Sequence, residues 1–252
     1  MGTYAMTGGA TGIGAAIREQ LRARGERVIV VDIKDADIVA DLGARAGRDA
    51  AVAGILERAP EGLDGFVACA GVGPNLPPAL VASINYFGVV GVTEGLRAAL
   101  ERRRGGVVVI SSNSAPMSTD AAYVELLLAG DEAGAGARVT GQNGQVAYSG
   151  SKMAVARWVR RSAPAWAGKG VRLNAIAPGL IKTPLTASAT ADARFADAMK
   201  AFEDSIPVGR AGQPADIAAM ACFLLSPAAE FVCGSVLFVD GGHDAMFRPD
   251  QF

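Results

Sequence analysis

The chain has 252 residues, of which 50% are hydrophobic and 19% are charged, and its formal net charge at pH 7 is -1. These values are typical of a globular protein with a substantial core, and the near-zero charge argues against nucleic acid as a partner. Three cysteines and one histidine without metal-ligand spacing predict neither a disulfide framework nor a metal site. The sequence has no secretory signal and no apolar run of about 18 residues, so we expect a cytoplasmic protein without a membrane span.

The N-terminal segment predicts a strand over 3–6, a glycine-rich turn and a helix over 12–24. The turn reads Thr7-Gly8-Gly9-Ala10-Thr11-Gly12-Ile13-Gly14. In such a turn, backbone N–H groups at a helix N-terminus are open to a pyrophosphate. Its Gly-x-x-x-Gly-x-Gly spacing differs from the usual Gly-x-Gly-x-x-Gly. A tight structural connection is the alternative interpretation at this point.

The second predicted strand, over 27–32, ends in Asp32, which lies 18 positions after Gly14. This interval is close to the ~20 residues expected for the carboxylate that binds an adenosine ribose. A carboxylate accepts hydrogen bonds from a ribose 2′-hydroxyl but repels a 2′-phosphate, so the sequence favours NAD over NADP. Lys34, two residues further on, could soften this preference.

Strands and helices alternate along the rest of the chain. We expect strands over 37–40, 65–69, 107–111, 171–175 and 235–238, and helices over 45–58, 79–101, 148–166 and 214–225. This alternation predicts an α/β fold, a doubly wound Rossmann-like domain with a mostly parallel sheet and helices on both faces. Since no Pro/Ser-rich linker interrupts the pattern, we expect residues 1–252 to form a single domain.

Tyr148 and Lys152 lie four residues apart at the start of the predicted helix over 148–166, so their side chains share one helix face. A free tyrosine titrates near pH ~10, and a nearby positive charge favours its deprotonated form. We therefore expect Lys152 to lower the pKa of Tyr148 and make it an acid/base near neutrality. A surface tyrosine beside a solvated lysine is the alternative.

Serines follow the strand over 107–111, in the segment Ile110-Ser111-Ser112-Asn113-Ser114. A nucleophilic serine hydrolase is the rival use of such a serine, but the segment lacks the Gly-x-Ser-x-Gly elbow. The single histidine, His243, is interpreted as a loop residue without a catalytic role.

The glycine turn of residues 7–14 together with Tyr148-x-x-x-Lys152 resembles the classical short-chain dehydrogenase/reductase family. Weaker landmarks follow in the order of the family and cover nearly the whole chain, namely Asp41-Leu42, Ala70-Gly71, Asn85, Ser111-Ser112, Pro178-Gly179, Thr183 and Val239-Asp240-Gly241-Gly242. One departure is Cys69, which replaces the second amide residue of the usual Asn-Asn-Ala-Gly turn. We interpret Cys69 as a small buried residue rather than a reactive thiol.

The resemblance implies an NAD(P)-dependent oxidoreductase acting on CH–OH donors and gives its residues roles. Tyr148 would exchange a proton with the substrate oxygen, and Ser112, chosen over Ser111 and Ser114, would hydrogen-bond to the same oxygen. Lys152 would bind the nicotinamide ribose, and Asn85 would hold a water that connects Lys152 to solvent. The residues implied in cofactor binding are Gly8, Thr11, Gly12, Ile13, Gly14, Asp32, Asp41, Leu42, Ala70, Gly71, Tyr148, Lys152, Pro178, Gly179, Ile181 and Thr183.

Tyr148 lies 36 positions after Ser112, a longer interval than is common in the family, which indicates an insertion near 115–145. We expect a helix over 120–129 that ends at Gly130. The insertion is a lid, a contact surface or a passive surface segment. It resembles that of bacterial family members that act with NAD on 3α-hydroxysteroids and other bulky carbonyls. That resemblance implies a homodimer.

The segment 183–210 is expected to form a lid on the substrate side. Its apolar residues either line a pocket or pack within the lid, namely Ala193, Phe195, Ala196, Met199 and Phe202. The predicted function is an NAD-dependent dehydrogenase for a small-molecule substrate, a hydroxysteroid or another bulky secondary alcohol. The alternatives are a general carbonyl reductase, a dehydrogenase for a terpenoid or aromatic alcohol, and a non-catalytic NAD sensor.

Overall fold

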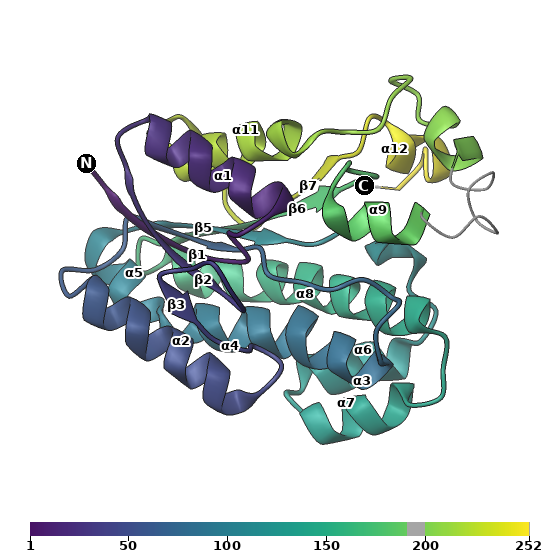
Figure 1. Cartoon of the computed structure of the whole chain (residues 1–252), viewed down its shortest axis with the longest axis horizontal. Helices are drawn as coiled ribbons and strands as arrows, with labels where there is room; N and C mark the ends of the chain where they lie inside the picture. The colour runs from purple at the N-terminus through teal and green to yellow at the C-terminus, as the bar shows by residue number, and fades with distance from the viewer. Residues whose placement is uncertain (191–199, 252) are drawn as a thin grey trace.

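A seven-stranded parallel sheet forms the centre of the computed structural model, which describes residues 1–190 and 200–251 (Figure 1). The strand order is β3-β2-β1-β4-β5-β6-β7, and every neighbouring pair is parallel. The strands are β1 (Thr3–Thr7), β2 (Arg27–Asp32), β3 (Ile38–Val39), β4 (Gly65–Ala68), β5 (Gly106–Ile110), β6 (Arg172–Pro178) and β7 (Val236–Val239). The order reverses between β1 and β4, which makes a crevice at their carboxyl ends. The predicted doubly wound fold is confirmed.

The sheet carries a hydrophobic core on each face. In β4, Phe66 and Ala68 join one buried cluster while Val67 joins the other. The alternation arises because successive side chains of a strand point to opposite faces. A parallel sheet covered on both faces has strands that are apolar at nearly every position. This explains the uninterrupted apolar runs in β2 and β5.

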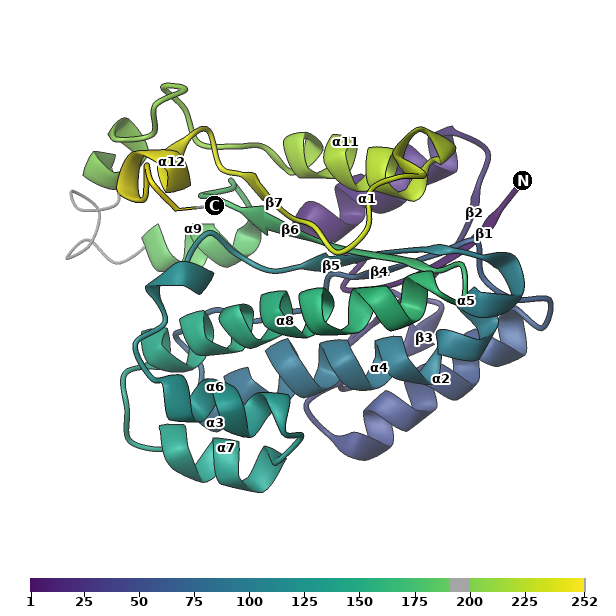
Figure 2. The same ribbon diagram turned by 180° about the vertical axis from the view of Figure 1, so that it is seen from behind.

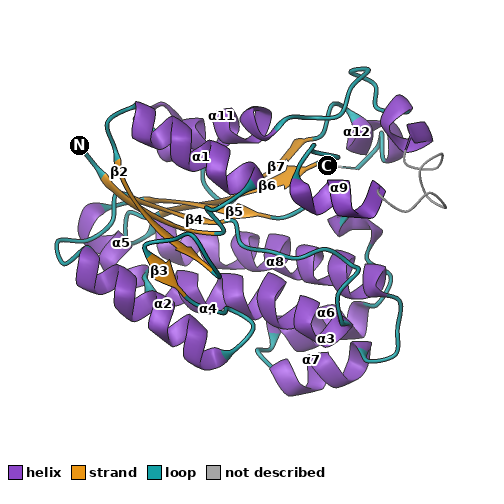
Figure 3. Cartoon of the chain, viewed as in Figure 1, coloured by secondary structure: helices purple, strands orange, loops and turns teal. Residues whose placement is uncertain are grey.

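Helices cover both faces, as the two opposite views of Figures 1 and 2 show. The helices α1 (Gly12–Ala23) and α11 (Pro214–Leu225) pack on one face. The other face carries α2 (Arg45–Arg58), α4 (Val89–Gly95), α5 (Arg97–Arg103) and α8 (Gly144–Ala167). The short helices α9 (Pro184–Thr190) and α12 (His243–Phe247) lie beyond the carboxyl ends of the strands (Figure 3).

The predicted helix over 79–101 is wrong as a single helix. It consists of α3 (Pro78–Ala82), the π-helix η1 (Ser83–Gly88), α4 and α5, with a bend of 50° between Gly95 and Arg97. Both sides of the bend bury their apolar face, so the apolar periodicity continues through it. Gly95 lies so close to α2 that an added Cβ would be 2.7 Å from Val52 Cγ2.

No single helix among the described residues is long and apolar enough to cross a membrane. The bent pair Pro78–Gly95 and Arg97–Arg103 meets the length and composition criteria only when its two parts are combined.

The insertion folds into two helices below α8. The predicted helix over 120–129 is α6 (Ala121–Leu128), which Asp120 caps by accepting a hydrogen bond from the Tyr123 N–H at 3.0 Å. Gly130 follows it with φ +77°, as expected for a residue that ends a helix. A second helix, α7 (Glu132–Val139), was not predicted because its two glycines weaken helix propensity. The helix α6 packs against α8, and α7 packs against α3.

Candidate active site

A cavity of about 520 Å³ lies at the carboxyl ends of the strands, where the strand order reverses. This volume is in the usual range for a pocket that binds a small molecule or cofactor. Every residue that the sequence implied in cofactor binding lines it, and so does Ser112. The fold thus collects side chains from across the sequence at one site.

The glycine turn is built by contacts of backbone against backbone. An added Cβ at Gly14 would be 1.8 Å from the Gly8 carbonyl oxygen, and one at Gly8 would be 2.6 Å from the Ala70 nitrogen. Gly8 and Gly12 also have φ of +73° and +56°, which favour glycine. The N-terminus of α1 therefore opens onto the cavity without side chains in the way. Such a cradle fits a pyrophosphate.

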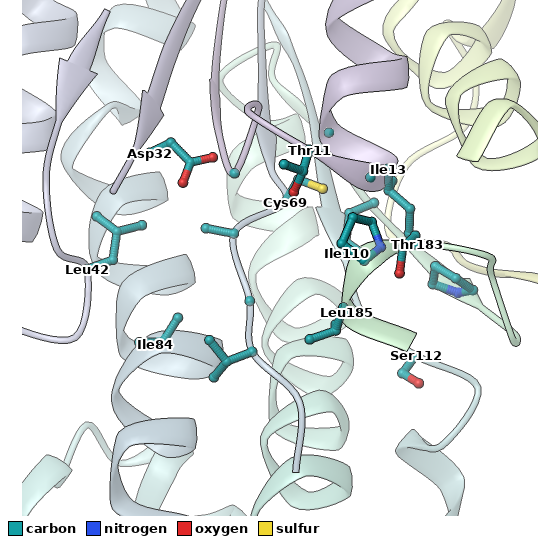
Figure 4. A pocket seen from close by; sticks show the side chains of 18 of the residues that line it. Thr11, Ile13, Asp32, Leu42, Cys69, Ile84, Ile110, Ser112, Thr183 and Leu185 are labelled. Atoms are coloured by element: carbon teal, nitrogen blue, oxygen red, sulfur yellow. The ribbon is translucent and has the colours of Figure 1, made fainter. Parts of the chain in front are cut away.

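Asp32 is held at the rim of this turn. Its carboxylate accepts hydrogen bonds from the N–H groups of Ala10 at 2.9 Å and Ile33 at 2.7 Å. Figure 4 shows Asp32 with Leu42 and Ile84 on one side of the cavity and Ser112 on the other. The carboxylate and the serine hydroxyl thus mark opposite ends of the site.

Lys152 is buried in the wall of the cavity. Its ammonium Nζ donates a hydrogen bond to the Ile110 carbonyl oxygen at 2.9 Å, and the residue is only 5% exposed. Burial lowers the pKa of Lys152 to about 8. The Ser111 hydroxyl donates to the Lys152 carbonyl oxygen at 2.9 Å, which ties the end of β5 to α8.

Tyr148 lies on the same face of α8, with Lys152 Nζ 5.8 Å from its ring centroid. The expectation that Lys152 lowers the pKa of Tyr148 is wrong for this structure, in which burial raises that pKa. A hydrogen bond with Ser112 opposes the rise. The Lys152 ammonium has little effect because it is directed to the Ile110 carbonyl group rather than to the phenol. Tyr148 is thus a protonated phenol near neutrality.

The structure separates the three candidate serines. The Ser111 hydroxyl donates its hydrogen bond to the Lys152 backbone carbonyl oxygen, whereas Ser112 hydrogen-bonds to Tyr148. Ser114 does not line the cavity; its N–H and hydroxyl both donate to Ser112 Oγ, at 3.1 and 3.0 Å. Ser112 is therefore the serine hydroxyl that lies beside the phenol, and Ser114 holds it there.

Asn85 is fully buried in η1 and does not line the cavity. Its Nδ2 donates to the Val72 carbonyl oxygen at 3.0 Å, and its Oδ1 accepts from the Val72 N–H at 2.8 Å. An added Cβ on Gly71 would lie 3.2 Å from Asn85 Oδ1 and 3.5 Å from Lys152 Nζ. Asn85 thus fixes the segment after β4 and approaches Lys152 across Gly71. Its role in holding a water stays a prediction.

The start of the segment over 183–210 lies against the glycine turn. Thr183 Cγ2 is 3.3 Å from the position of a Cβ on Gly12, and Leu185 of α9 lines the cavity. Phe202, however, is absent from the cavity wall; its ring stacks on His243 with a centroid separation of 4.6 Å. Ala193, Phe195, Ala196 and Met199 lie outside the described residues.

The expectation for His243 is wrong, and that for Cys69 is correct for its reactivity but not for its full burial. His243 is not a loop residue, since it is the first residue of α12 and is fully buried. Cys69 is half-buried and lines the cavity, and burial raises the pKa of its thiol to about 12. A thiol with so high a pKa is a poor nucleophile near neutrality. The described residues contain no group of three His, Cys, Asp or Glu side chains suited to a metal ion.

Several apolar wall residues were missed by the sequence analysis. Leu76, Leu80 and Ile84 all line the cavity, from the segment before α3, from α3 and from η1 respectively. Leu80 of α3 and Ile84 of η1 are spaced i, i+4 on one continuous helical stretch, which places them on one face, whereas Leu76 precedes α3. The spacing of Leu80 and Ile84 was visible in the sequence and could have identified these two residues.

Comparisons with known proteins agree with this geometry. Residues 3–124 match the family model described as short chain dehydrogenase, and residues 133–244 match the model described as Enoyl-(Acyl carrier protein) reductase. The chain is 41% identical over 259 aligned residues to a 3-alpha-hydroxysteroid dehydrogenase/carbonyl reductase of Comamonas testosteroni, with 100% of each chain covered. The chain belongs to the short-chain dehydrogenase/reductase family. It is therefore an oxidoreductase of this family.

Two further relatives of this short-chain dehydrogenase/reductase show the same relationship. A cis-4-hydroxycyclohexanecarboxylate dehydrogenase of Sinomonas cyclohexanicum is 32% identical, with 96% of each chain covered. The solved structure of a 3-alpha-hydroxysteroid dehydrogenase from Pseudomonas sp. B-0831 in complex with NADH superposes with a TM-score of 0.94. That structure is 45% identical, and the alignment covers 99% of this chain and 100% of the other.

Proposed function

We propose that this protein is an NAD-dependent dehydrogenase that interconverts a secondary alcohol and a ketone on a bulky substrate, with a 3α-hydroxysteroid as the leading candidate. One observation carries the proposal: the hydrogen-bonded pair Tyr148 and Ser112 and the buried Lys152 share one cavity with Asp32. The non-catalytic NAD sensor is disfavoured because a sensor needs no phenol paired with a serine beside its ligand.

The nucleotide preference follows from the charges around the cavity. Asp32 is oriented by two backbone N–H groups, and Lys152 is the only Lys or Arg among the described residues that line the cavity. Apart from Lys152, which hydrogen-bonds to the Ile110 carbonyl oxygen, no cation in that wall would offset the repulsion between Asp32 and a 2′-phosphate, which favours NAD over NADP. The solved relative in complex with NADH supports this choice. When bound, the nicotinamide supplies the hydride acceptor or donor.

The side chains of the site would handle the proton of the substrate. Tyr148 takes the hydroxyl proton of an alcohol or gives its own proton to a ketone oxygen, and Ser112 hydrogen-bonds to the same oxygen. Lys152, with a pKa of about 8, is mostly protonated at pH 7 and would bind the nicotinamide ribose. Because the pKa of Tyr148 is raised before ligands bind, we expect alcohol oxidation to accelerate as pH rises.

The size of the substrate is inferred from the mouth of the cavity. Leu76, Leu80 and Leu185 line it and are still 36–45% exposed, so they offer apolar surface to a bound ring system. Relatives named for hydroxysteroids and for a hydroxycyclohexane carboxylate agree with a secondary alcohol on an aliphatic ring. General carbonyl reduction is the second candidate, because the name of the relative from Comamonas testosteroni includes carbonyl reductase.

The first test is NADH formation from NAD and androsterone by the wild type and Tyr148→Phe, with NADP in parallel. We expect turnover with NAD, and a loss of about a hundredfold to ten-thousandfold in Tyr148→Phe while NAD binding is kept. Tyr4→Phe is the matched control, because Tyr4 lies in β1 outside the cavity wall. NAD binding without turnover of androsterone would contradict the steroid assignment. Equal activity of Tyr148→Phe would contradict the acid/base role.

We also propose a homodimer, since the insertion resembles that of dimeric members of the family. The helices α6 and α7 cover α8 and α3, which reduces the surface of this layer that another copy could contact. Phe231 is fully exposed five residues before the edge strand β7, where a second copy could cover it. Light scattering after size-exclusion chromatography should give twice 25.7 kDa. A monomer or tetramer mass would contradict the proposal.

A further inference from the structure

A buried arginine connects the insertion to the wall of the cavity. Arg48 of α2 has a side chain that is only 9% exposed. Its Nε donates to the Leu42 carbonyl oxygen at 2.8 Å and its Nη2 to the Gly43 carbonyl oxygen at 3.2 Å. The same guanidinium donates to both carboxylate oxygens of Glu132, from Nη1 at 2.8 Å and from Nη2 at 2.5 Å. Glu132 is the first residue of α7 in the insertion.

Glu132 compensates the buried charge of Arg48, while its own side chain is 38% exposed. A buried guanidinium is costly unless it is paired and its N–H groups are satisfied, and a bidentate carboxylate is its strongest partner. The Arg48 guanidinium holds the pKa of Glu132 below its ordinary value, with a smaller contribution from a hydrogen bond with Ser83. The Arg48 side chain also lies over the Phe87 ring, 5.8 Å from its centroid. Without Glu132, Arg48 would keep a buried charge with carbonyl partners alone.

The loop over 40–44, between β3 and α2, depends on these contacts. An added Cβ at Gly47 would lie 1.9 Å from the Asp41 carbonyl oxygen, and one at Gly88 would lie 3.2 Å from Leu42 Cβ. The loop is thus packed against α2 and η1, and Arg48 donates hydrogen bonds to two of its carbonyl groups. Asp41 and Leu42 both line the cavity, and Leu42 lies at the end where Asp32 lies (Figure 4). A shift of Arg48 would move this part of the wall.

We propose that Glu132 is a positioning residue for the adenosine half of the dinucleotide. Through Arg48 it fixes the carbonyl groups of Leu42 and Gly43, and with them the wall that faces the adenosine. The insertion therefore acts on cofactor affinity from outside the cavity, since Glu132 itself does not line it. This inference rests on the proposed use of NAD.

The test compares Glu132→Gln with the wild type by calorimetry with ADP-ribose, which is NAD without its nicotinamide ring and so keeps the adenosine half, and by steady-state kinetics. We expect ADP-ribose to bind about fivefold more weakly and the KM for NAD to rise by the same factor. The KM for the alcohol and kcat at saturating NAD should change less than twofold. Arg138→Gln is the matched control, because it breaks an ion pair with Asp120 inside the insertion that does not reach the loop. Its ADP-ribose affinity should equal that of the wild type.

Arg48→Lys is the second variant. It keeps the positive charge but loses the bidentate contact, so we expect a similar loss of ADP-ribose affinity. Circular dichroism establishes that each variant is folded before its affinity is compared. Unchanged ADP-ribose affinity in folded Glu132→Gln would overturn the inference, and so would an equal loss in Arg138→Gln. If the wild type oxidises no alcohol, the proposed function fails, while the ADP-ribose comparison still tests the role of Glu132.

Discussion

Replacing Lys152 by Met should stabilise the protein at pH 7 while removing the proposed ribose ligand. Burial lowers the pKa of Lys152 from 10.5 to about 8. At about 1.4 kcal/mol per pKa unit, keeping this ammonium buried costs about 3 kcal/mol. The variant also loses the hydrogen bond to the Ile110 carbonyl oxygen, a loss of about 1 kcal/mol. We therefore expect Lys152→Met to raise the free energy of unfolding by about 2 kcal/mol.

The advantage of the variant should depend on pH in one direction. Below pH 8, Lys152 is protonated in both the folded and the unfolded wild type, so the full cost of burial is present. Between about pH 8 and pH 10.5, the folded state loses its proton while the unfolded state keeps it. The wild type therefore gains stability relative to Lys152→Met as pH rises through this window. Above it, both states are neutral and only the lost hydrogen bond distinguishes the two proteins.

Urea denaturation of both proteins at pH 7, 8, 9 and 10, without nucleotide, measures this difference. The two tryptophans provide a fluorescence signal, and Trp158 and Trp166 both lie in α8. Subtracting the two free energies at each pH cancels the groups that titrate equally in both proteins. A difference that stays constant from pH 7 to pH 10 would refute the reasoning, as would a variant that is less stable at pH 7.

Three further predictions concern the walls of the site. In Gly150→Ala, the new Cβ would lie 2.5 Å from Tyr123 Cδ1 of the insertion, so we expect α8 to shift, Tm to fall and kcat to drop by about tenfold or more. Wild-type kcat in that variant would contradict a tight contact. Gly14→Ala should weaken NAD binding by more than about a hundredfold in calorimetry, since its Cβ would overlap the Gly8 carbonyl oxygen. Asp32→Ala should lower the NAD/NADP ratio of kcat/KM by about tenfold, and an unchanged ratio would refute its role.

The fold was predictable where local signals mark the ends of an element. The predicted bounds of β2, α2 and α11 agree with the structure at both ends. For α11 the reason is a proline at the first helical position together with the reciprocal hydrogen bonds of Gln213 and Asp216. The start of α8 was predicted four residues late, because Tyr148 was taken as its first residue while Asn143 caps the helix upstream. When the apolar pattern after a capping residue is weak, the capping residue alone is poor evidence for the start of a helix.

The site was predictable as a set of wall residues but not as a set of interactions. Motif spacing identified Tyr148, Lys152 and the glycine turn, and the topology of the sheet brings their elements together. The predicted direction of the Tyr148 pKa shift was wrong, because the shift depends on burial and on which group accepts a hydrogen bond from the Lys152 ammonium. That acceptor, the Ile110 carbonyl oxygen, lies 42 positions away in sequence. The spacing of Tyr148 and Lys152 carries no information about it.

The insertion shows why such long-range contacts matter for function. Its two helices contact two parts of the site: Tyr123 of α6 packs on Gly150, which lies between Tyr148 and Lys152 in the sequence of α8, and Glu132 of α7 pairs with Arg48 beside the loop over 40–44. Both contacts rest on residues whose neighbours in sequence give no hint of a partner. A lid would move between open and closed positions, whereas Tyr123 is fully buried against Gly150 and Glu132 is held by two hydrogen bonds to the buried Arg48 guanidinium. The insertion is therefore better explained as a fixed support that joins α8, which carries Tyr148 and Lys152, to the loop over 40–44.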